Sequence, residues 1–440
     1  MNRYLNILPT MGLLVLLGCG GGPSPPPTDS VPPPELQPLF ALSIFVSGTG
    51  AGRVVSNSGE INCSGAGDKC KSDFVNGTSV ILTSTATVGS RFIGFGGDPD
   101  CFDGAIKISK KITCLATFMS TPTTTSTTTV TTTPKITVSA GYNYTCALLS
   151  DSKVKCWGLN DDGQLGNNAT STSLIPAMVS GITNANVISA GIDYTCAVLL
   201  GGTVNCWGLN DDGQLGNNAT STSLIPAMVI GITAATVVSA GESHTCAVLL
   251  GGTVNCWGLN NDGQLGNATT TNSRTPVVVS GMATATDISI GLSHTCAVLL
   301  DGKINCWGLN DDGQLGDGNG AAGKSSSLPV VVSGISTALS VSAGDAHTCA
   351  VLAEGAIRCW GAGVSGQLGN GSAGEEGSSV PVSVNGITTA ISVSAGSEHT
   401  CAQFANGMVS CWGGNGYGQL GNGNASLLNV LIPVNVTGLP

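Results

Sequence analysis

The chain has 440 residues, of which 9% are charged and 4% aromatic, and 64 are glycine. Abundant Gly, Thr, Val and Ser suit short strands and tight turns, and no stretch has helical apolar periodicity, so we predict an all-β protein. The net charge is −11, with nine basic and eight acidic residues up to residue 135 and six basic and eighteen acidic residues after it. An acidic body of this kind repels a phosphate backbone, which argues against nucleic acid as a partner.

Residues 1–18 form an apolar run with one basic residue, Arg3. The run is too short to span a bilayer and contains Asn6 and Pro9, which is typical of a signal peptide. Its end, LLGC at 16–19, resembles the lipobox of bacterial lipoproteins. That resemblance implies cleavage before Cys19 and lipid attachment to it. The alternative is an ordinary signal peptide in which Cys19 has no role.

Residues 19–39 include GGGPSPPPTDSVPPP at 20–34. Gly and Pro cannot build a core there, and the Pro clusters keep the chain extended, as expected of a tether. A lipidated anchor is held by acyl chains. We therefore predict a protein of the bacterial cell envelope, lipid-anchored at the outer membrane or cell surface. Without Cys19, 16 cysteines remain, an even number that suits disulfides in an exported protein.

Residues 40–118 are predicted to form a small β domain. Alternating runs at 41–46, 53–56, 79–84 and 112–118 are separated by Gly, Asn and Asp turns, as in short antiparallel strands. The passage from VSGTGAGRVVSNSGEINC to ITCLATF resembles the divergent internalin-type B-repeat domain of bacterial surface proteins. The resemblance implies a β-grasp-like module with disulfides Cys63–Cys70 and Cys101–Cys114. Four cysteines allow three pairings, so the sequence alone does not decide between them.

Residues 119–135 read MSTPTTTSTTTVTTTPK. Thr and Pro of such low complexity cannot pack a core, which predicts an exposed and fairly stiff linker.

Residues 136–440 consist of six repeats. The string CWGLNDDGQLG occurs at 156–166 and again at 206–216, and four near-copies follow. The repeat signature [YH]TCA…CWG…GQLG resembles the regulator of chromosome condensation family of β-propellers. The resemblance implies a ring of four-stranded blades, six here, with seven as the alternative. We expect the opening strand at 136–139 and the closing strand at 432–436 to pair within one blade and so remove the open edge.

Each repeat has two cysteines ten positions apart. If Cys196 faces Cys206 across a hairpin, residues 200–202 form a three-residue loop whose third residue needs a positive φ, normally Gly. Glycine occupies that place in five repeats, and Ser152 is the exception, where we expect strain or a different turn. Opposed strand residues lie within disulfide reach. The predicted pairs are Cys146–Cys156, Cys196–Cys206, Cys246–Cys256, Cys296–Cys306, Cys349–Cys359 and Cys401–Cys411.

The same repeats offer little to catalysis or to metal binding. His244, His294, His347 and His399 stand two residues before a cysteine, but Tyr144 and Tyr194 take that place in the first two repeats. No Cys-x-x-Cys spacing exists, so we interpret the histidines as packed residues and not as zinc ligands. No nucleophile elbow, Walker motif or dinucleotide motif is present, and the Asn-Asp-Asp-Gly pieces lack the spacing of a calcium loop. We predict no enzyme and no cofactor.

One asymmetry suggests a binding surface. The loop after the tryptophan is acidic in repeats one to four and uncharged in repeats five and six, where Tyr417 stands. Repeat symmetry should place these loops on one rim of the ring. The bland alternative is solvated turns in duplicated copies. The candidate rim residues are Asp161, Asp162, Asp211, Asp212, Asp262, Asp311, Asp312 and Tyr417.

The function predicted from these features is a non-catalytic, surface-anchored lipoprotein whose propeller mediates protein–protein interaction. The alternatives are a guanine-nucleotide exchange-type regulator, as the resembled family implies, and a propeller-type enzyme inhibitor. Export argues against a small GTPase as partner.

Overall fold

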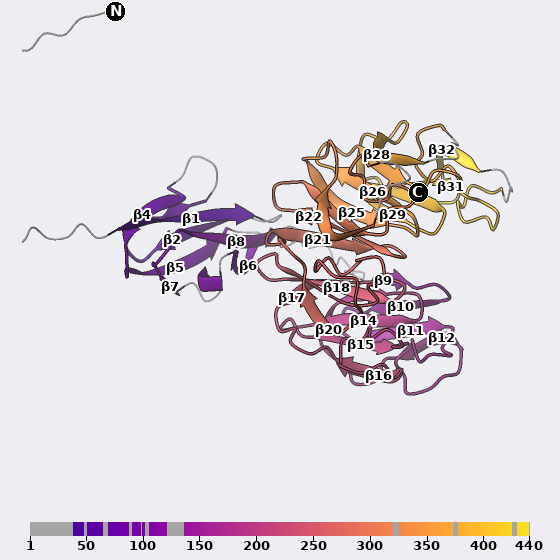
Figure 1. Ribbon diagram of the computed structural model, residues 1–440, viewed down its shortest axis with the longest axis horizontal. Helices are drawn as coiled ribbons and strands as arrows, with labels where there is room; N and C mark the ends of the chain where they lie inside the picture. Colours follow the sequence, from indigo (N-terminus) through magenta and orange to yellow (C-terminus); the bar gives the residue numbers. More distant parts are fainter. Residues whose placement is uncertain are drawn as a thin grey trace, which may run out of the picture.

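The computed structural model describes residues 38–47, 51–64, 69–87, 90–97, 99–101, 105–120, 136–319, 325–372, 377–424 and 429–439. These residues form strands, turns and one short 3-10 helix, which confirms the predicted all-β class (Figure 1). Within these ranges no helix has the length and apolar character needed to cross a membrane. The predicted signal peptide, Cys19 and nearly all of the tether and the Thr-rich linker lie outside the described residues.

An N-terminal unit is built from two four-stranded sheets, of order β4-β1-β8-β6 and β3-β2-β5-β7. Strands β1 and β8 pair in parallel, and all the other pairings are antiparallel. The elements are β1 (Leu39–Ser47), β2 (Gly52–Ser56), β3 (Asn62–Cys63), β4 (Lys71–Val75), β5 (Ser79–Ala86), β6 (Ser90–Gly97), the 3-10 helix η1 (Pro99–Cys101), β7 (Ala105–Lys107) and β8 (Ile112–Ser120).

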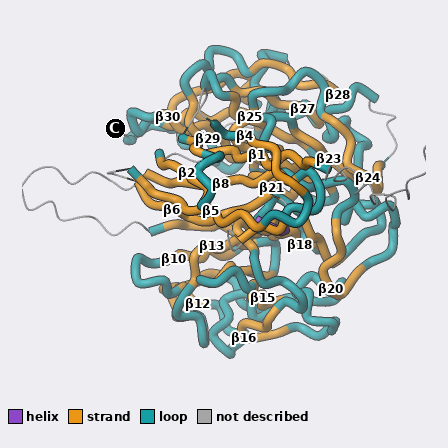
Figure 2. Tube along the Cα trace, turned by 90° about the vertical axis from the view of Figure 1, so that its left-hand side faces the viewer, coloured by secondary structure: helices purple, strands orange, loops and turns teal. Residues whose placement is uncertain are grey.

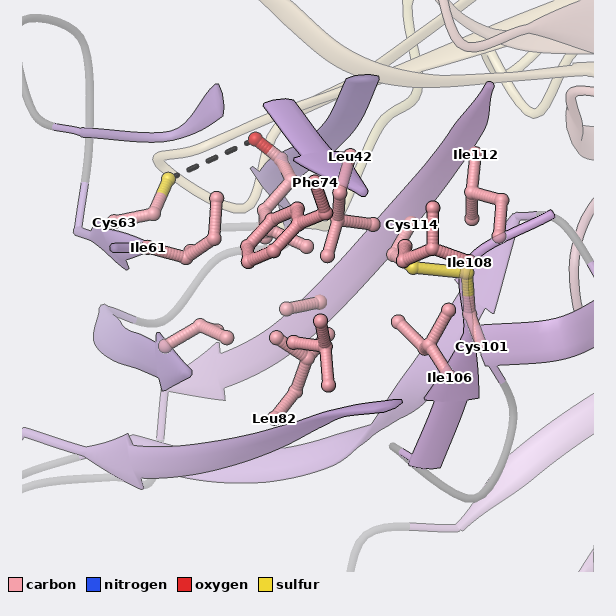
Figure 3. Close-up of a cluster of buried hydrophobic side chains, with 14 of the residues drawn as sticks. Leu42, Ile61, Cys63, Phe74, Leu82, Cys101, Ile106, Ile108, Ile112 and Cys114 are labelled. Carbon is pink, nitrogen blue, oxygen red and sulfur yellow. Dashed lines mark hydrogen bonds between the residues drawn. A yellow bond between two sulfur atoms is a disulfide. The ribbon is translucent and has the colours of Figure 1, made fainter. Parts of the chain in front are cut away.

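The two sheets of this unit share one apolar core (Figure 3). Leu42 and Phe74 enter it from one sheet, and Leu82 and Ile106 enter it from the other. Disulfides join Cys63 to Cys70 and Cys101 to Cys114, the pairing that the B-repeat resemblance implies. The described part of the unit contains no α-helix, so its form is a two-sheet sandwich.

Six further four-stranded antiparallel sheets, the blades, follow within the described part of residues 137–435. Blade 1 contains β9 (Thr137–Ala140), β10 (Tyr144–Leu148), β11 (Val154–Gly158) and β12 (Ser173–Met178). Blade 2 contains β13 (Ala185–Ala190), β14 (Tyr194–Leu199), β15 (Val204–Gly208) and β16 (Ser223–Met228). Blade 3 contains β17 (Ala235–Ala240), β18 (His244–Leu249), β19 (Val254–Gly258) and β20 (Ser273–Val278).

Blade 4 contains β21 (Ala285–Ile290), β22 (His294–Leu299), β23 (Ile304–Gly308) and β24 (Ser326–Val331). Blade 5 contains β25 (Ala338–Ala343), β26 (His347–Leu352), β27 (Ile357–Gly361) and β28 (Ser378–Ser383). Blade 6 contains β29 (Ala390–Ala395), β30 (His399–Phe404), β31 (Val409–Gly413) and β32 (Val430–Asn435). The blades succeed one another around an arc, from β10 to β30 in Figure 2, and the first strands of successive blades pack against each other.

The second and third strands of each blade form the predicted disulfide hairpin. In blade 2, Cys196 lies opposite Cys206, and the Leu199 amide donates to the Thr203 carbonyl to close loop 200–202. Its disulfide joins Cα atoms 4.1 Å apart, and the other five hairpins repeat this arrangement. Ser152 has a φ of 63° in the same turn, so blade 1 keeps the turn and accepts the strain. In the chain-entropy model each closed loop stabilises the fold by about 2.5–3 kcal/mol.

In blades 2 to 5, alternate residues of the hairpin face the two neighbouring blades. In blade 2, Cys196 and Val198 pack with Ala247 and Trp257 of blade 3 in one buried cluster. The indole N–H of Trp257 donates to the carbonyl of Gln214 in blade 2, at 2.8 Å. The tryptophans of blades 2 to 6 are all fully buried in this way. A blade therefore completes its core only with a side chain of the next blade.

The structure corrects one expectation about the chain ends. Strand β9 pairs with β10 in blade 1, and β32 pairs with β31 in blade 6, so the two strands do not share a blade. Each repeat instead forms one whole blade, because the sequence from the first strand of a repeat to its fourth folds locally. The end-to-end pairing predicted from the sequence is wrong.

The hairpin glycines supply the first test. Gly302 has a φ of 77°, and a Cβ there would lie 2.5 Å from the Ser336 carbonyl oxygen. Gly302→Ala should lower the free energy of unfolding by about 2 kcal/mol or more, through both backbone strain and the clash. Gly281 has a φ of 71° but has no atom within 4 Å of the added Cβ. Gly281→Ala should therefore cost only the strain, about 1 kcal/mol. Equal losses in denaturant unfolding would contradict the role given to the clash.

Candidate functional site

The loops after the third strands lie at one end of every blade, and those of blades 1 to 4 carry the predicted aspartates. In blade 2, Tyr194 pairs with Gly208, so the turn before Tyr194 and the loop after Gly208 leave the sheet at the same end. The disulfide hairpin loop 200–202 is at the opposite end. We call the first end, which repeats in all six blades, the acidic face of the arc. The second is the hairpin face.

In blades 1 to 3, buried asparagine and glutamine side chains fix the loop after the third strand. Asn160 is fully buried, and its side-chain amide donates to the carbonyls of Ala169 and Ser171, while its oxygen accepts from the Leu165 amide. The Asp162 amide donates to the Gln164 side chain at 3.0 Å. The same arrangement recurs in the next blades. The carboxylates therefore project from fixed backbone, which suits a preformed binding surface.

The predicted aspartates of neighbouring blades come close enough to influence one another. Asp161 and Asp211 are exposed, and Asp162 is half-buried. Partial burial raises the pKa of Asp162, and the negative charges of Asp161 and Asp211 raise it further. Burial and the charge of Asp311 likewise raise the pKa values of Asp262 and Asp312. The structure thus brings the candidate aspartates of blades 1 and 2 into mutual repulsion, and likewise those of blades 3 and 4.

Four acidic residues that sequence analysis missed join this face: Asp193, Glu242, Asp345 and Glu398. They stand in the short turns between the first and second strands. The pKa of Glu242 is raised by partial burial and then by the charges of Asp345 and Asp212, which come from other blades. These four residues could have been predicted from the hairpin register, because it places the turns beside the loops that carry the candidate aspartates.

The sector predicted to be uncharged is therefore not free of charge. Glu398 lies in blade 6 and accepts a hydrogen bond from the Ser365 hydroxyl of blade 5 at 3.3 Å. Tyr417 occupies the place of Asp162 in its own loop and is 97% exposed, with its amide donating to Gln419. The ring of Tyr417 is the most exposed large apolar surface of this face.

The histidines predicted to be packed residues link successive blades. His244 Nε2 lies 2.9 Å from the Thr295 hydroxyl of blade 4, and that hydroxyl donates to the Gln264 carbonyl. Because Thr295 has only one hydroxyl proton, it accepts from the His244 Nε2–H. His294 and His347 bind Thr348 and Thr400 in the same way. Burial lowers the pKa values of His244, His294 and His347 to about 3, 4 and 3.

In the residues that the structure describes, no group of three or more His, Cys, Asp or Glu side chains is arranged to hold a metal ion. The cysteines beside the histidines are all in disulfides, so no thiolate faces an imidazole there.

The hairpin face meets the N-terminal unit. Phe45 and Leu115 of that unit line a small apolar pocket together with Gly251, Thr284 and Leu300 at the hairpin end of blades 3 and 4. Figure 1 shows the unit on this side of the arc. The acidic face consequently lies on the side away from the N-terminal unit.

Comparison with protein families agrees with the arrangement of the blades. The model of the RCC1-like domain matches residues 17–402. The chain belongs to the RCC1-like domain family. The model of the Regulator of chromosome condensation (RCC1) repeat matches residues 390–419, within blade 6 of this RCC1-like chain. The longer match extends over the N-terminal unit, whose parallel β1–β8 pairing differs from the antiparallel blades.

Known proteins share parts of the RCC1-like repeats. The ultraviolet-B receptor UVR8 of Arabidopsis thaliana is 39% identical over 100 residues, 22% of each chain. Human E3 ubiquitin-protein ligase HERC2 is 34% identical over 89 residues, 19% of this chain and 2% of that protein. The aligned segments thus span about a fifth or less of these relatives.

Two solved structures share the fold. Yeast RCC1 (Prp20), solved bound to Kap60, superposes with a TM-score of 0.63 at 22% identity, covering 69% of this chain and 75% of that one. Human WBSCR16 gives a TM-score of 0.61 at 22% identity, covering 78% and 88%. Likeness at this identity establishes the propeller fold alone.

The buried histidines predict a pH dependence of stability. Their folded pKa values lie below the unfolded value of about 6.5, so the unfolded chain binds more protons and the stability they confer is lost as pH falls below about 6.5. The free energy of unfolding should decrease between pH 7 and pH 5. A variant with His244, His294 and His347 changed to Tyr, the residue of blades 1 and 2, should have a flatter profile in that window. Identical slopes for the two proteins would show that other groups dominate.

Proposed function

We propose that this RCC1-like protein is a non-catalytic, lipid-anchored protein of the bacterial cell envelope whose acidic face binds another protein. The observation that carries the proposal is the position of the acidic loops. They project from fixed backbone on the side of the arc away from the N-terminal unit. A tether that leads into that unit would leave the acidic face directed outward.

The anchor is supported by the sequence. Residues 16–19 resemble a lipobox, and the Gly/Pro-rich residues after them suit a tether. The sixteen cysteines that follow Cys19 are all paired in the structure, which suits an oxidising compartment. On this proposal the N-terminal unit serves as a spacer between the tether and the blades. Export would separate the blades from cytosolic GTPases, so nucleotide exchange is not proposed.

The partner's chemistry follows from the electrostatics. Several carboxylates on this face have raised pKa values, first because they are partly buried and then because they repel each other. A partner with clustered Lys or Arg would relieve that repulsion and would be drawn in by the summed field. Such a field accelerates encounter most at low salt.

The anchor is tested by fractionation. The native protein should be found in the membrane fraction with an acylated N-terminal cysteine. Cys19→Ala should abolish acylation. It should also release the exported protein from the membrane fraction, because the proposed anchor is the lipid on Cys19. Membrane attachment that persists in Cys19→Ala would refute lipidation as the anchor.

The acidic face is tested by neutralisation. Asp211, Asp212, Asp311 and Asp312 changed to Asn should leave thermal unfolding unchanged and slow the association of basic surface proteins captured by the native chain. The rate at low salt should fall by about tenfold, and the rates at high salt should converge. The control carries the same charge change away from this face: Asp73→Asn, Asp151→Asn, Asp301→Asn and Glu354→Gln. Equal association rates for the two quadruple variants would overturn the role of the acidic face.

A further inference from the structure

Blade 1 has one uncovered side. In blades 2 to 6 this side is packed against the preceding blade, from β10 against β13 through to β26 against β29. Among the described residues, β9 and β10 have no such packing against β29 and β30 of blade 6. We call this side of blade 1 the open face. Its residues are Val138, Thr145, Trp157 and Leu174.

The open face keeps the apolar first-strand position of the covered faces, which is Val or Ile in all six blades, whereas the position of Leu174 is Leu in blades 1, 2 and 6 and Arg or Ser in blades 3 to 5. Val138 occupies the place of Ile188 in blade 2, as their pairing with Ala147 and Ala197 shows. Val138 is 60% exposed, and Ile188 is 7% exposed. Leu174 is 91% exposed, whereas its counterpart Leu224 is half-buried on the loop of the preceding blade. Trp157 is the one tryptophan of the six that is not fully buried.

Two donors on this face also lack the acceptor that their counterparts have. In blade 2 the Thr195 hydroxyl and the Trp207 indole N–H both donate to the Gln164 carbonyl of blade 1, at 2.9 and 3.0 Å. In blades 3 to 6 the equivalent Thr hydroxyl and Trp N–H likewise both donate hydrogen bonds to one Gln carbonyl of the preceding blade. In the described part of the chain the Thr145 hydroxyl and the Trp157 N–H have no such acceptor. Five equivalent junctions thus define what the open face is shaped to receive.

We propose that the open face of blade 1 is a docking site for a four-stranded β-blade of a partner protein. The partner would present an apolar strand pair to Val138 and Leu174, and a loop carbonyl to Thr145 and Trp157. This surface is separate from the acidic face, so the proposal does not rest on the proposed function. It requires only the junction chemistry that the chain already repeats five times.

Blade 6 of the same chain does not match this role. Blades 2 to 5 each bury a valine against the next blade, such as Val198, which is 1% exposed. Blade 6 has Gln403 at that place, paired with Val409, and Gln403 is exposed. A polar outer side is what the terminal unit of a repeat array needs for solubility. Blade 6 keeps Gln419 at the acceptor position of Gln164, but with Gln403 in place of the buried valine it lacks the apolar side that covers a following blade.

A second copy of the chain does not match it either. The outward sides of blades 1 to 5 are occupied within their own chain, and blade 6 offers the polar side with Gln403. Two open faces brought together would set the Trp157 N–H and the Thr145 hydroxyl against the same two donors, with no Gln carbonyl between them. The apolar side that would complete the junction is therefore proposed to come from another protein.

The experiment uses Trp157 as the reporter, because it is the tryptophan of the native chain left accessible to a quencher. The probe is a single oxidised repeat, residues 185–234 of this chain, with Trp207→Phe to remove its fluorescence. Adding the probe to the full chain should shield Trp157 from acrylamide and saturate at one probe per chain. Leu174→Asp should weaken probe binding by about tenfold or more. Ile225→Asp, at a position of blade 2 that is already exposed, should leave it unchanged.

If the isolated repeat does not fold, a second variant tests the proposal. A copy of residues 185–234 inserted between Lys135 and Ile136 places a blade directly before β9, and Trp157 should then be shielded. Continued quenching of Trp157 in that variant would overturn the proposal. Shielding in the native chain alone at every concentration would show that blade 6 covers the face. Shielding that rises with chain concentration, together with a doubled mass in light scattering, would show that a second copy covers the face. Coverage by blade 6 or by a second copy would each overturn the proposal.

Discussion

The hydrogen bond from the tryptophan of each of blades 2 to 6 to the glutamine carbonyl of the preceding blade is the contact on which the rest of the structure depends. Trp257 is fully buried between two blades, and its N–H reaches Gln214 O at 2.8 Å. A buried aromatic of this size supplies much of the apolar area at a junction, and its polar edge would be costly without a partner. The disulfide hairpins make each blade locally rigid. It is the tryptophan that joins one rigid blade to the next.

The same loop connects stability with the candidate function. Gln214 gives its carbonyl to Trp257 and Thr245, and its side chain accepts from the Asp212 amide. The acidic residues therefore stand two or three positions from the point where two blades are joined. The junction keeps these mutually repelling carboxylates close together, because separating the two blades would expose a buried tryptophan. A face preorganised in this way loses little conformational entropy when a basic partner binds.

Local features were predictable from the sequence, and relations between distant repeats were not. The ten-residue cysteine spacing and Gly202 fixed the hairpin register, because a three-residue loop leaves few alternatives. That register determined the acidic face. The register did not predict that the charge of Asp345 raises the pKa of Glu242, because the distance between these two residues depends on how strongly the arc curves between their blades. The predicted pairing of the chain ends failed for another reason: each repeat folds locally into one whole blade, and the repeat period is the same wherever a blade begins within the repeat.

The open face shows how a repeat protein differs from an ordinary core. In a protein without repeats, the exposure of Val138 and Leu174 would not indicate what kind of surface could cover them. Here five equivalent junctions specify the partner's carbonyl, its apolar strands and its orientation. Blade 6 departs from its neighbours at Gln403, whereas blade 1 keeps the junction residues Thr145 and Trp157. One end of the array is adapted to water and the other is not. Because exposed apolar surface of this kind favours association, the asymmetry gives the arc a direction in which it can be extended.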